Sequence, residues 1–165
     1  MQTLLEYKSW ADRIFYDALA RFSDAQLQQD RPMLFGNMLS LLNHIYAMDV
    51  VWQSHLSGGS HQYQTRNPED VLAFSALEKH QHQINQWFEN YVTSMPSENL
   101  NNNIQFIFIG GGDGQMRVID ILHHIVNHSS YHRGHIEGVF YQMGVEPPTT
   151  DISVFLQTHT TSNCV

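Results

Sequence analysis

The segment HHIVNHSSYHRGH contains five histidines. The imidazole side chain of histidine is a common metal ligand and proton carrier. They are His123, His124, His128, His132 and His135. With about 100° between successive residues of a helix, all except His123 fall within an arc of roughly 80°. Histidines four residues apart can offer two ring nitrogens to one ion. The spacing therefore indicates a metal site on this helix.

Buried histidines also have an ordinary structural role, which provides a second interpretation. A neutral imidazole in a helical core needs partners for one donor and one acceptor, and each group left unpaired costs about 1–3 kcal/mol. A shared ion would satisfy several rings at once. Spacing alone leaves both interpretations open, and it does not choose among His124, His128, His132 and His135.

A third ligand has to come from another helix, because two rings one turn apart provide only two nitrogens. His44 is the best candidate, since it lies between Leu41 and Met48 on or beside an apolar helical stripe. A core histidine bonded to the backbone is the alternative for His44. The remaining histidines occupy polar or loop-like segments, and we expect solvent to reach them: His55, His61, His80, His82 and His159.

Two known classes of histidine motif do not match this chain. A zincin-type protease places Glu directly after the first histidine as the general base, where this chain has Ser129. A di-iron bundle pairs Glu with a histidine three residues later on two helices, and this sequence has no such pair.

Composition narrows the classes of function. The formal net charge is -8, from 16 acidic and 8 basic side chains, so a nucleic-acid partner is disfavoured. No run approaches the roughly 18 apolar residues of a membrane span. The single cysteine, Cys164, allows no disulfide within the chain, and the first residues do not resemble a signal peptide. We therefore expect a cytoplasmic protein.

Apolar periodicity predicts the elements that position these histidines. Apolar residues recur at three- and four-residue steps in four segments, 4–22, 37–56, 67–92 and 117–143. The last is expected to stop at Gly144. Four such helices, each with one apolar face, pack most simply as a bundle.

The third segment has the clearest start signal. Asn67 can cap a helix, Pro68 suits the first helical position, and Glu69 and Asp70 suit the positive end of the helix dipole. The second segment has a plausible cap in Asn37. We therefore expect these two helices to begin at residues 67 and 37.

Two smaller elements complete the prediction. Ile104, Phe106 and Phe108 alternate with other residues before a Gly-rich turn, which predicts a β-hairpin. Asp151 could cap a last short helical turn. The predicted fold is all-α: a single four-helix-bundle domain over residues 1–165, with a small β-hairpin between helices 3 and 4 and a short C-terminal helical turn.

Three motifs of this chain resemble the DinB-like (DinB/YfiT) family of metalloenzymes: LLNHIYAMDVVW, VNHSSYHRGHI and the tail GVEPPTTDISVFL. The resemblance covers nearly the whole chain and implies a four-helix bundle. It also implies a metal triad of one second-helix histidine and both histidines of the pair before Arg-Gly. In this chain they are His44, His128 and His132, while His124 and His135 would line the site or act as alternate ligands.

Three neutral imidazoles suit one divalent transition metal ion, nickel or zinc, and leave a coordination position open for chemistry. Asp49, Tyr131 and His135 are candidates to orient a ligand or a water molecule around such an ion. We expect Asn127 to have an ordinary surface role.

Characterised members of the wider superfamily depend on thiols, so the resemblance implies a metal-dependent thiol S-transferase. Its partners would be an electrophile and a small-molecule thiol such as bacillithiol or glutathione. Cys164 is not expected to be the nucleophile, since it lies near the chain end without an evident base. Two alternatives stay open: a non-catalytic metal- or ligand-binding stress protein, and a hydrolase with Asp49 or a spare histidine as base. Relatives are commonly homodimers, so we expect a homodimer.

Overall fold

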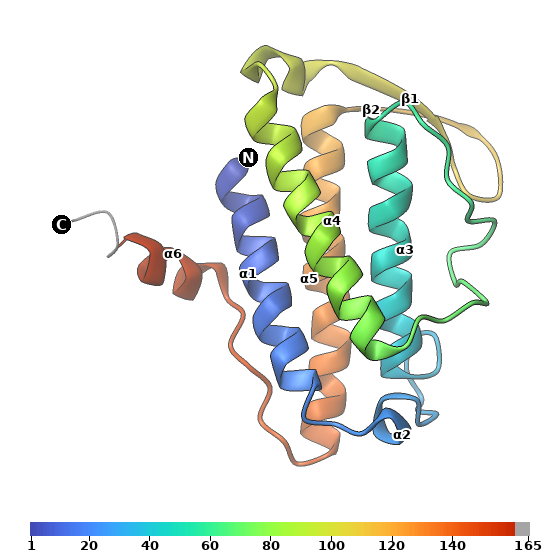
Figure 1. The fold of residues 1–165 in the computed structure, drawn as a ribbon, viewed down its shortest axis with the longest axis vertical. Coiled ribbons are helices and arrows are strands. Elements are labelled where there is room, and N and C mark those ends of the chain that lie inside the picture. The colour runs from blue at the N-terminus through green and yellow to red at the C-terminus, as the bar shows by residue number, and fades with distance from the viewer. Residues whose placement is uncertain (161–165) are drawn as a thin grey trace.

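The computed structural model describes residues 1–160, in which four long helices lie side by side (Figure 1). They are α1 (Gln2–Leu19), α3 (Met38–Leu56), α4 (Phe74–Ser94) and α5 (Val118–Gln142). Each of α1 and α3 packs against both α4 and α5. The predicted four-helix bundle is therefore confirmed.

Shorter elements join or extend these helices. They are α2 (Asp24–Leu27), the 3-10 helix η1 (Ser97–Asn101), β1 (Asn103–Ile107), β2 (Asp113–Arg117) and α6 (Ile152–Thr160). The antiparallel pair β1–β2 confirms the predicted hairpin, and Ile104 lies opposite Met116. Helix α6 has nine residues and is longer than the single turn that we expected.

Local signals set most helix ends. The side chain of Asn37 accepts a hydrogen bond from the backbone N–H of Ser40 at 2.8 Å, which confirms it as the cap of α3. Gly144 follows α5 with φ +68°, a left-handed conformation that favours glycine and ends the helix. Helix α1 stops at Leu19, three residues before its expected end, because Ser23 forms a capping box with Gln26 and starts α2.

The predicted start of the third helix at Asn67 is wrong. Helix α4 begins at Phe74, and residues 57–73 before it form a connection without helix or strand that runs back along α3 (Figure 1). The side chain of Asn43 accepts from the N–H of Leu72 at 2.8 Å and donates to its carbonyl oxygen at 3.1 Å. Two hydrogen bonds to a buried amide outweigh a capping preference worth about 1 kcal/mol.

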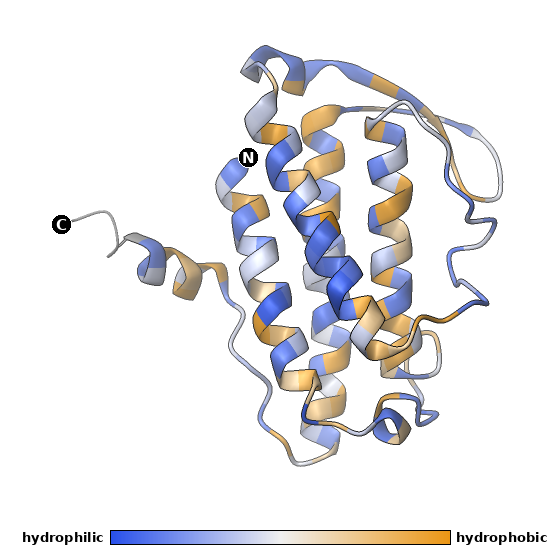
Figure 2. Ribbon diagram, in the orientation of Figure 1, coloured by the Kyte–Doolittle hydropathy of each residue, from blue (hydrophilic) through white to orange (hydrophobic). Residues whose placement is uncertain are grey.

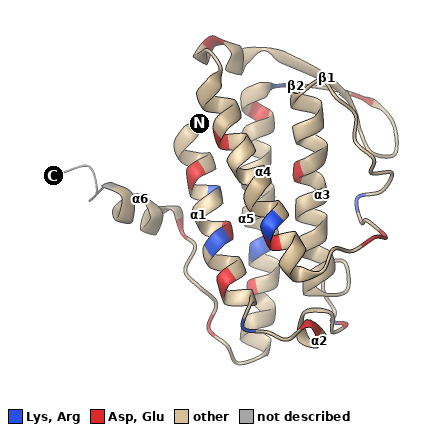
Figure 3. Ribbon diagram, viewed as in Figure 1, with Lys and Arg blue, Asp and Glu red and all other residues tan. Residues whose placement is uncertain are grey.

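A polar layer divides the core of the bundle into two large apolar clusters, and Ala47, Met48 and Val51 of α3 form a small third cluster. One large cluster lies at the level of Leu5, Trp52 and Phe88, and the other at the level of Phe15 and Leu41. Figure 2 shows the apolar segments of the helices, and Figure 3 shows that charged residues occur on each of the four long helices. Four of these charged residues are buried: Lys8, Asp12, Asp49 and Arg133. None of the described helices is long and apolar enough to cross a membrane.

Candidate metal centre

Helices α3 and α5 bring three imidazole rings together at one point. His44 lies on α3, and His128 and His132 lie one turn apart on α5. The Nε2 atom of His128 is 3.2 Å from Nε2 of His44 and 3.1 Å from Nε2 of His132. The three rings therefore meet as the spacing and the resemblance implied.

These separations fit the coordination of one ion. Zinc–imidazole bonds of about 2.0–2.1 Å, at N–Zn–N angles between the octahedral and tetrahedral values, place the nitrogens about 2.8–3.4 Å apart. The ligand atoms of the three residues all lie within 4.8 Å of one another. Three facing nitrogens cannot all be satisfied by hydrogen bonds among themselves, whereas one cation between them satisfies all three. The donor set suits a late first-row transition metal.

The tautomer of His44 is set by its other ring nitrogen. Nδ1 of His44 lies within hydrogen-bond distance of the carbonyl oxygen of Arg66, which can only accept, so Nδ1 carries the proton. The Nε2 lone pair then faces His128 and His132. A histidine that donates to a backbone carbonyl in this way is the usual arrangement of a metal ligand.

Burial keeps all three rings neutral at physiological pH. Loss of solvent lowers the pKa of His44, lowers that of His128 to about 2 and lowers that of His132 to about 4. The neighbouring rings of the triad lower the pKa of His128 and His132 further. Metal binding requires neutral imidazole, so the site has its ligands in the required state.

The triad forms one wall of a cavity of about 460 Å³, here called the triad cavity. Most of its other lining is apolar: Leu34, Phe35, Met48, Val51, Trp52, Phe106, Phe108, Ile109 and Tyr131. His55, Arg66 and His124 complete the lining. An ion held by the triad would thus face a space large enough for a small organic molecule.

The other two histidines on the same face of α5, His124 and His135, differ in their position relative to the triad cavity. His124 lines the triad cavity, and its ring centroid is 5.5 Å from that of His128. His135 lies beside His132, with ring centroids 5.6 Å apart, but outside the cavity lining. Neither belongs to the three-histidine group with metal-ligand spacing.

The other candidate residues also have clear positions. Tyr131 is 59 % exposed and lies at the edge of the cavity, against the ring of His132. Asn127 is exposed, as expected of a surface residue. His55 was predicted to lie in solvent, and this is wrong: it is half-buried and lines the cavity, because the hairpin residue Phe106 packs on its ring.

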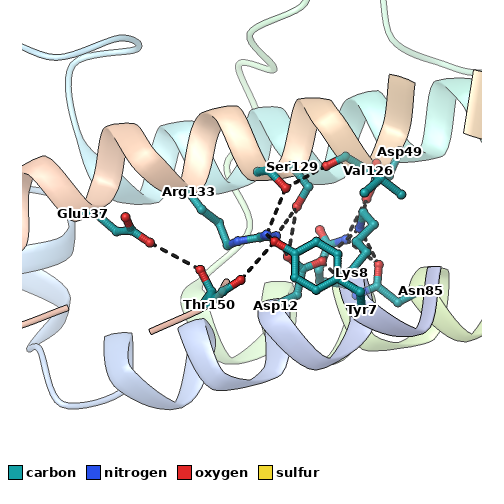
Figure 4. Close-up of polar contacts among 12 residues, drawn as sticks. Tyr7, Lys8, Asp12, Asp49, Asn85, Val126, Ser129, Arg133, Glu137 and Thr150 are labelled. Carbon is teal, nitrogen blue, oxygen red and sulfur yellow. Dashed lines mark hydrogen bonds and ion pairs between the residues drawn. The ribbon is translucent and has the colours of Figure 1, made fainter. Parts of the chain in front are cut away.

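The bundle also contains a buried ionic network that sequence reasoning missed (Figure 4). Lys8 donates to Asp12 and Asp49, each at 2.9 Å, and to Asn85 at 2.6 Å. Arg133 donates to Asp12 at 2.7 Å. Burial alone would raise the pKa of Asp12, but Lys8 and Arg133 outweigh it and lower the pKa to about 2. Two cations and two carboxylates therefore stabilise one another inside the bundle.

This network holds the orientation of α5. Ser129 and Arg133 follow His128 and His132 directly in the chain, and both donate to Asp12 of α1. Residues adjacent in a helix point about 100° apart, so anchoring these two side chains on α1 turns the histidines toward α3. Asp49 bonds to Lys8 and Gln81 within this network, and no described hydrogen bond joins it to the triad. A lysine and an arginine within apolar helical stripes were the signal that could have revealed the network.

Comparisons with known proteins agree with the fold and the site. The chain is 26 % identical over 164 residues to Protein DinB of Bacillus subtilis (strain 168), covering 93 % of this chain and 91 % of that protein. It superposes with a TM-score of 0.65 on the crystal structure of a DinB-like protein from Bacillus cereus ATCC 10987, at 17 % identity, over 87 % of this chain and 91 % of that one. The family model of the DinB family matches residues 1–162. With its helical bundle and its three convergent histidines, the chain belongs to the DinB family.

Proposed function

We propose that this protein is a metal-dependent S-transferase that joins a low-molecular-weight thiol to an electrophile. The observation that carries the proposal is the position of the triad in the wall of a mostly apolar cavity of about 460 Å³. His44, His128 and His132 would hold one divalent ion, nickel or zinc, and leave further coordination positions toward the cavity.

The three histidines would hold the ion, and the apolar lining residues would shield the reactants from water. When bound, the ion would favour the thiolate form of the thiol at neutral pH. Apolar lining residues such as Met48 and Val51 would exclude water from the reacting atoms. The thiol would release its proton to solvent, its sulfur would form a bond to the electrophilic carbon, and the leaving group would depart with the electron pair of the bond that breaks. The exchange needs no oxidant or reductant.

The cavity favours this proposal over the two alternatives. A non-catalytic metal-binding stress protein has no need of an apolar pocket beside the open coordination position. A hydrolase needs a general base near the metal, and the Asp49 carboxylate bonds to Lys8 and Gln81 instead. Hydrolysis would therefore depend on a spare histidine such as His124.

Cobalt substitution tests the proposal directly. Cobalt-loaded protein mixed with glutathione or bacillithiol should develop a thiolate-to-metal charge-transfer band, and should conjugate the thiol to a test electrophile. The His128→Ala variant should do neither, because it lacks the central ligand. If wild-type protein that holds cobalt shows no band and no conjugation, the proposal is wrong.

Three further properties belong to the proposal. We propose zinc or nickel as the resident ion, which elemental analysis of protein purified without a histidine tag would decide. We propose that the protein acts in the cytoplasm, where thiols are kept reduced. We also propose a homodimer, to be checked by sedimentation.

A further inference from the structure

The lining of the triad cavity differs in charge from the rest of the molecule. The chain carries a formal net charge of -8, yet none of the described residues that line the cavity is Asp or Glu. Among the lining residues that the structure describes, only Arg66 carries a permanent charge. A cleft with one sign of charge concentrates ligands of the opposite sign.

Arg66 is held at the cavity by its backbone while its side chain stays available. Its carbonyl oxygen accepts from Nδ1 of His44, which anchors the residue beside the triad. The residue as a whole is exposed, and no described carboxylate lies within 4 Å of its guanidinium. A guanidinium presents a fork of N–H donors that matches a carboxylate.

Much of the remaining lining is aromatic. The ring centroids of Trp52 and Phe106 are 5.0 Å apart at an interplanar angle of 75°, and those of Phe106 and Phe108 are 4.9 Å apart at 81°. Phe108 and Tyr131 are 45 % and 59 % exposed. Rings that meet edge to face offer both faces and edges to a planar apolar group, and exposed aromatics at a rim are typical of a ligand site.

Two imidazoles add hydrogen-bond donors to the lining of the cavity. His55 and His124 line the cavity, and no described residue forms a hydrogen bond with their ring nitrogens. Each neutral ring can donate one N–H to an oxygen of a ligand. The cavity thus combines an aromatic surface, spare donors and one cation.

We propose that the triad cavity selects a small organic anion with a planar apolar body, and that Arg66 determines this selectivity. The body lies against Trp52 and Phe106, and its carboxylate is bound by Arg66. This inference rests on the proposed function in taking the ligand to be the electrophilic substrate, but the binding step itself can be measured without turnover.

Calorimetric titration with 2-naphthoate and its neutral analogue 2-naphthamide tests the proposal. The full-length protein is titrated both metal-loaded and after chelation, with its fold checked by circular dichroism. Naphthoate should bind more tightly than naphthamide in both forms, and acetate should bind weakly because it lacks the planar body. In Arg66→Gln the affinity for naphthoate should fall about tenfold while that for naphthamide stays the same.

Arg13→Gln is the matched control. Arg13 is exposed on α1 and lines a different cavity, so this variant removes the same charge from the molecule without touching the triad cavity. It should bind naphthoate within about twofold of wild type, as expected for a distant surface charge. Equal affinities for naphthoate and naphthamide, or equal losses in both arginine variants, would overturn the proposal. If chelation unfolds the protein, the metal-loaded titrations decide.

The two proposals can fail separately. A cobalt–thiolate band with no preference for naphthoate would leave the S-transferase standing and remove the selectivity of Arg66. Preference for naphthoate that depends on Arg66, without any thiolate band, would identify an organic-anion site and remove the S-transferase.

Discussion

The ring of His44 donates from Nδ1 to the carbonyl oxygen of Arg66, 22 residues further along the chain. This contact leaves the Nε2 lone pair of His44 directed at Nε2 of His128, 3.2 Å away. It also places Arg66 at the triad cavity. One hydrogen bond thus fixes both the tautomer of a candidate metal ligand and the backbone position of Arg66, which carries the only permanent charge among the described lining residues.

Replacement of His128 by alanine should abolish metal binding. Its Nε2 atom is the one that lies within 3.2 Å of both other ligand atoms, so its loss removes the central ligand and leaves only two imidazoles. The zinc affinity should fall by more than the roughly 10–100-fold that follows loss of an outer-shell partner. Competition with a chromophoric chelator measures this affinity. His135→Ala is the control and should keep its zinc; loss of zinc from this variant would mean that the ligand set is different.

Acid should destabilise the metal-free protein below about pH 6.5. In the unfolded chain the histidines titrate near pKa 6.5, whereas in the folded protein burial holds the pKa of His128 at about 2 and that of His132 at about 4. Between these values the unfolded chain binds more protons, so the free energy of unfolding decreases as the pH falls. Urea unfolding of chelated protein from about pH 7.5 to 4.5 measures the slope.

Histidine variants identify which residues cause the dependence of the unfolding free energy on pH. His128→Gln removes one low-pKa ring and should make the slope shallower, while His123→Gln, on the exposed face of α5, should follow wild type. Identical slopes in all three proteins would show that the triad does not cause the pH dependence. The contribution of Asp12 is separate, because its pKa is lowered to about 2 and its stabilisation is lost only as the pH falls from about 4 to about 2.

Replacement of Asp12 by alanine should strongly destabilise the bundle. It removes the carboxylate that Lys8, Ser129 and Arg133 share, and leaves two buried cations with one carboxylate. Breaking a buried ion pair in this way costs about 3–5 kcal/mol. Chemical denaturation gives the change in unfolding free energy. Asp17→Ala, on an exposed position of α1, should change it by less than about 0.5 kcal/mol, and similar losses in both variants would contradict the role of the network.

Replacement of Asn43 by alanine should loosen the connection that runs back along α3. Its side chain satisfies both backbone groups of Leu72, and their loss should cost about 1–3 kcal/mol of unfolding free energy. Hydrogen exchange should accelerate at the Leu72 amide before it does in α3. The exposed Asn90→Ala of α4 serves as the control and should leave that amide protected. Unchanged exchange at Leu72 in Asn43→Ala would show that this bond does not hold the connection.

Local periodicity was sufficient to predict the four long helices and the histidine pair on α5 that forms part of the candidate site. Residues three and four apart share one face of any helix, so the pairing of His128 with His132 follows from the chain alone. The cap at Asn37 and the stop at Gly144 were also predictable, because each depends on contacts within a few residues.

Contacts between distant parts of the chain decided the rest. Helix α4 begins at Phe74 and not at the predicted Asn67, because Asn43 on α3 binds the backbone of Leu72. His55 became a lining residue because the hairpin places Phe106 on its ring. No local pattern contains such information, since the partners are separated by tens of residues.

The sequence by itself determined that this protein is a helical bundle with a pair of histidines at metal-ligand spacing on its last long helix. Only the tertiary structure decided that His44 faces this pair, that Arg66 joins the cavity beside it, and that an ionic network anchored on Asp12 orients α5. The physical reason is the separation along the chain between the residues that interact. Helical periodicity arises within one turn, whereas the direction of a side chain across a bundle depends on how the helices pack and which buried groups satisfy one another.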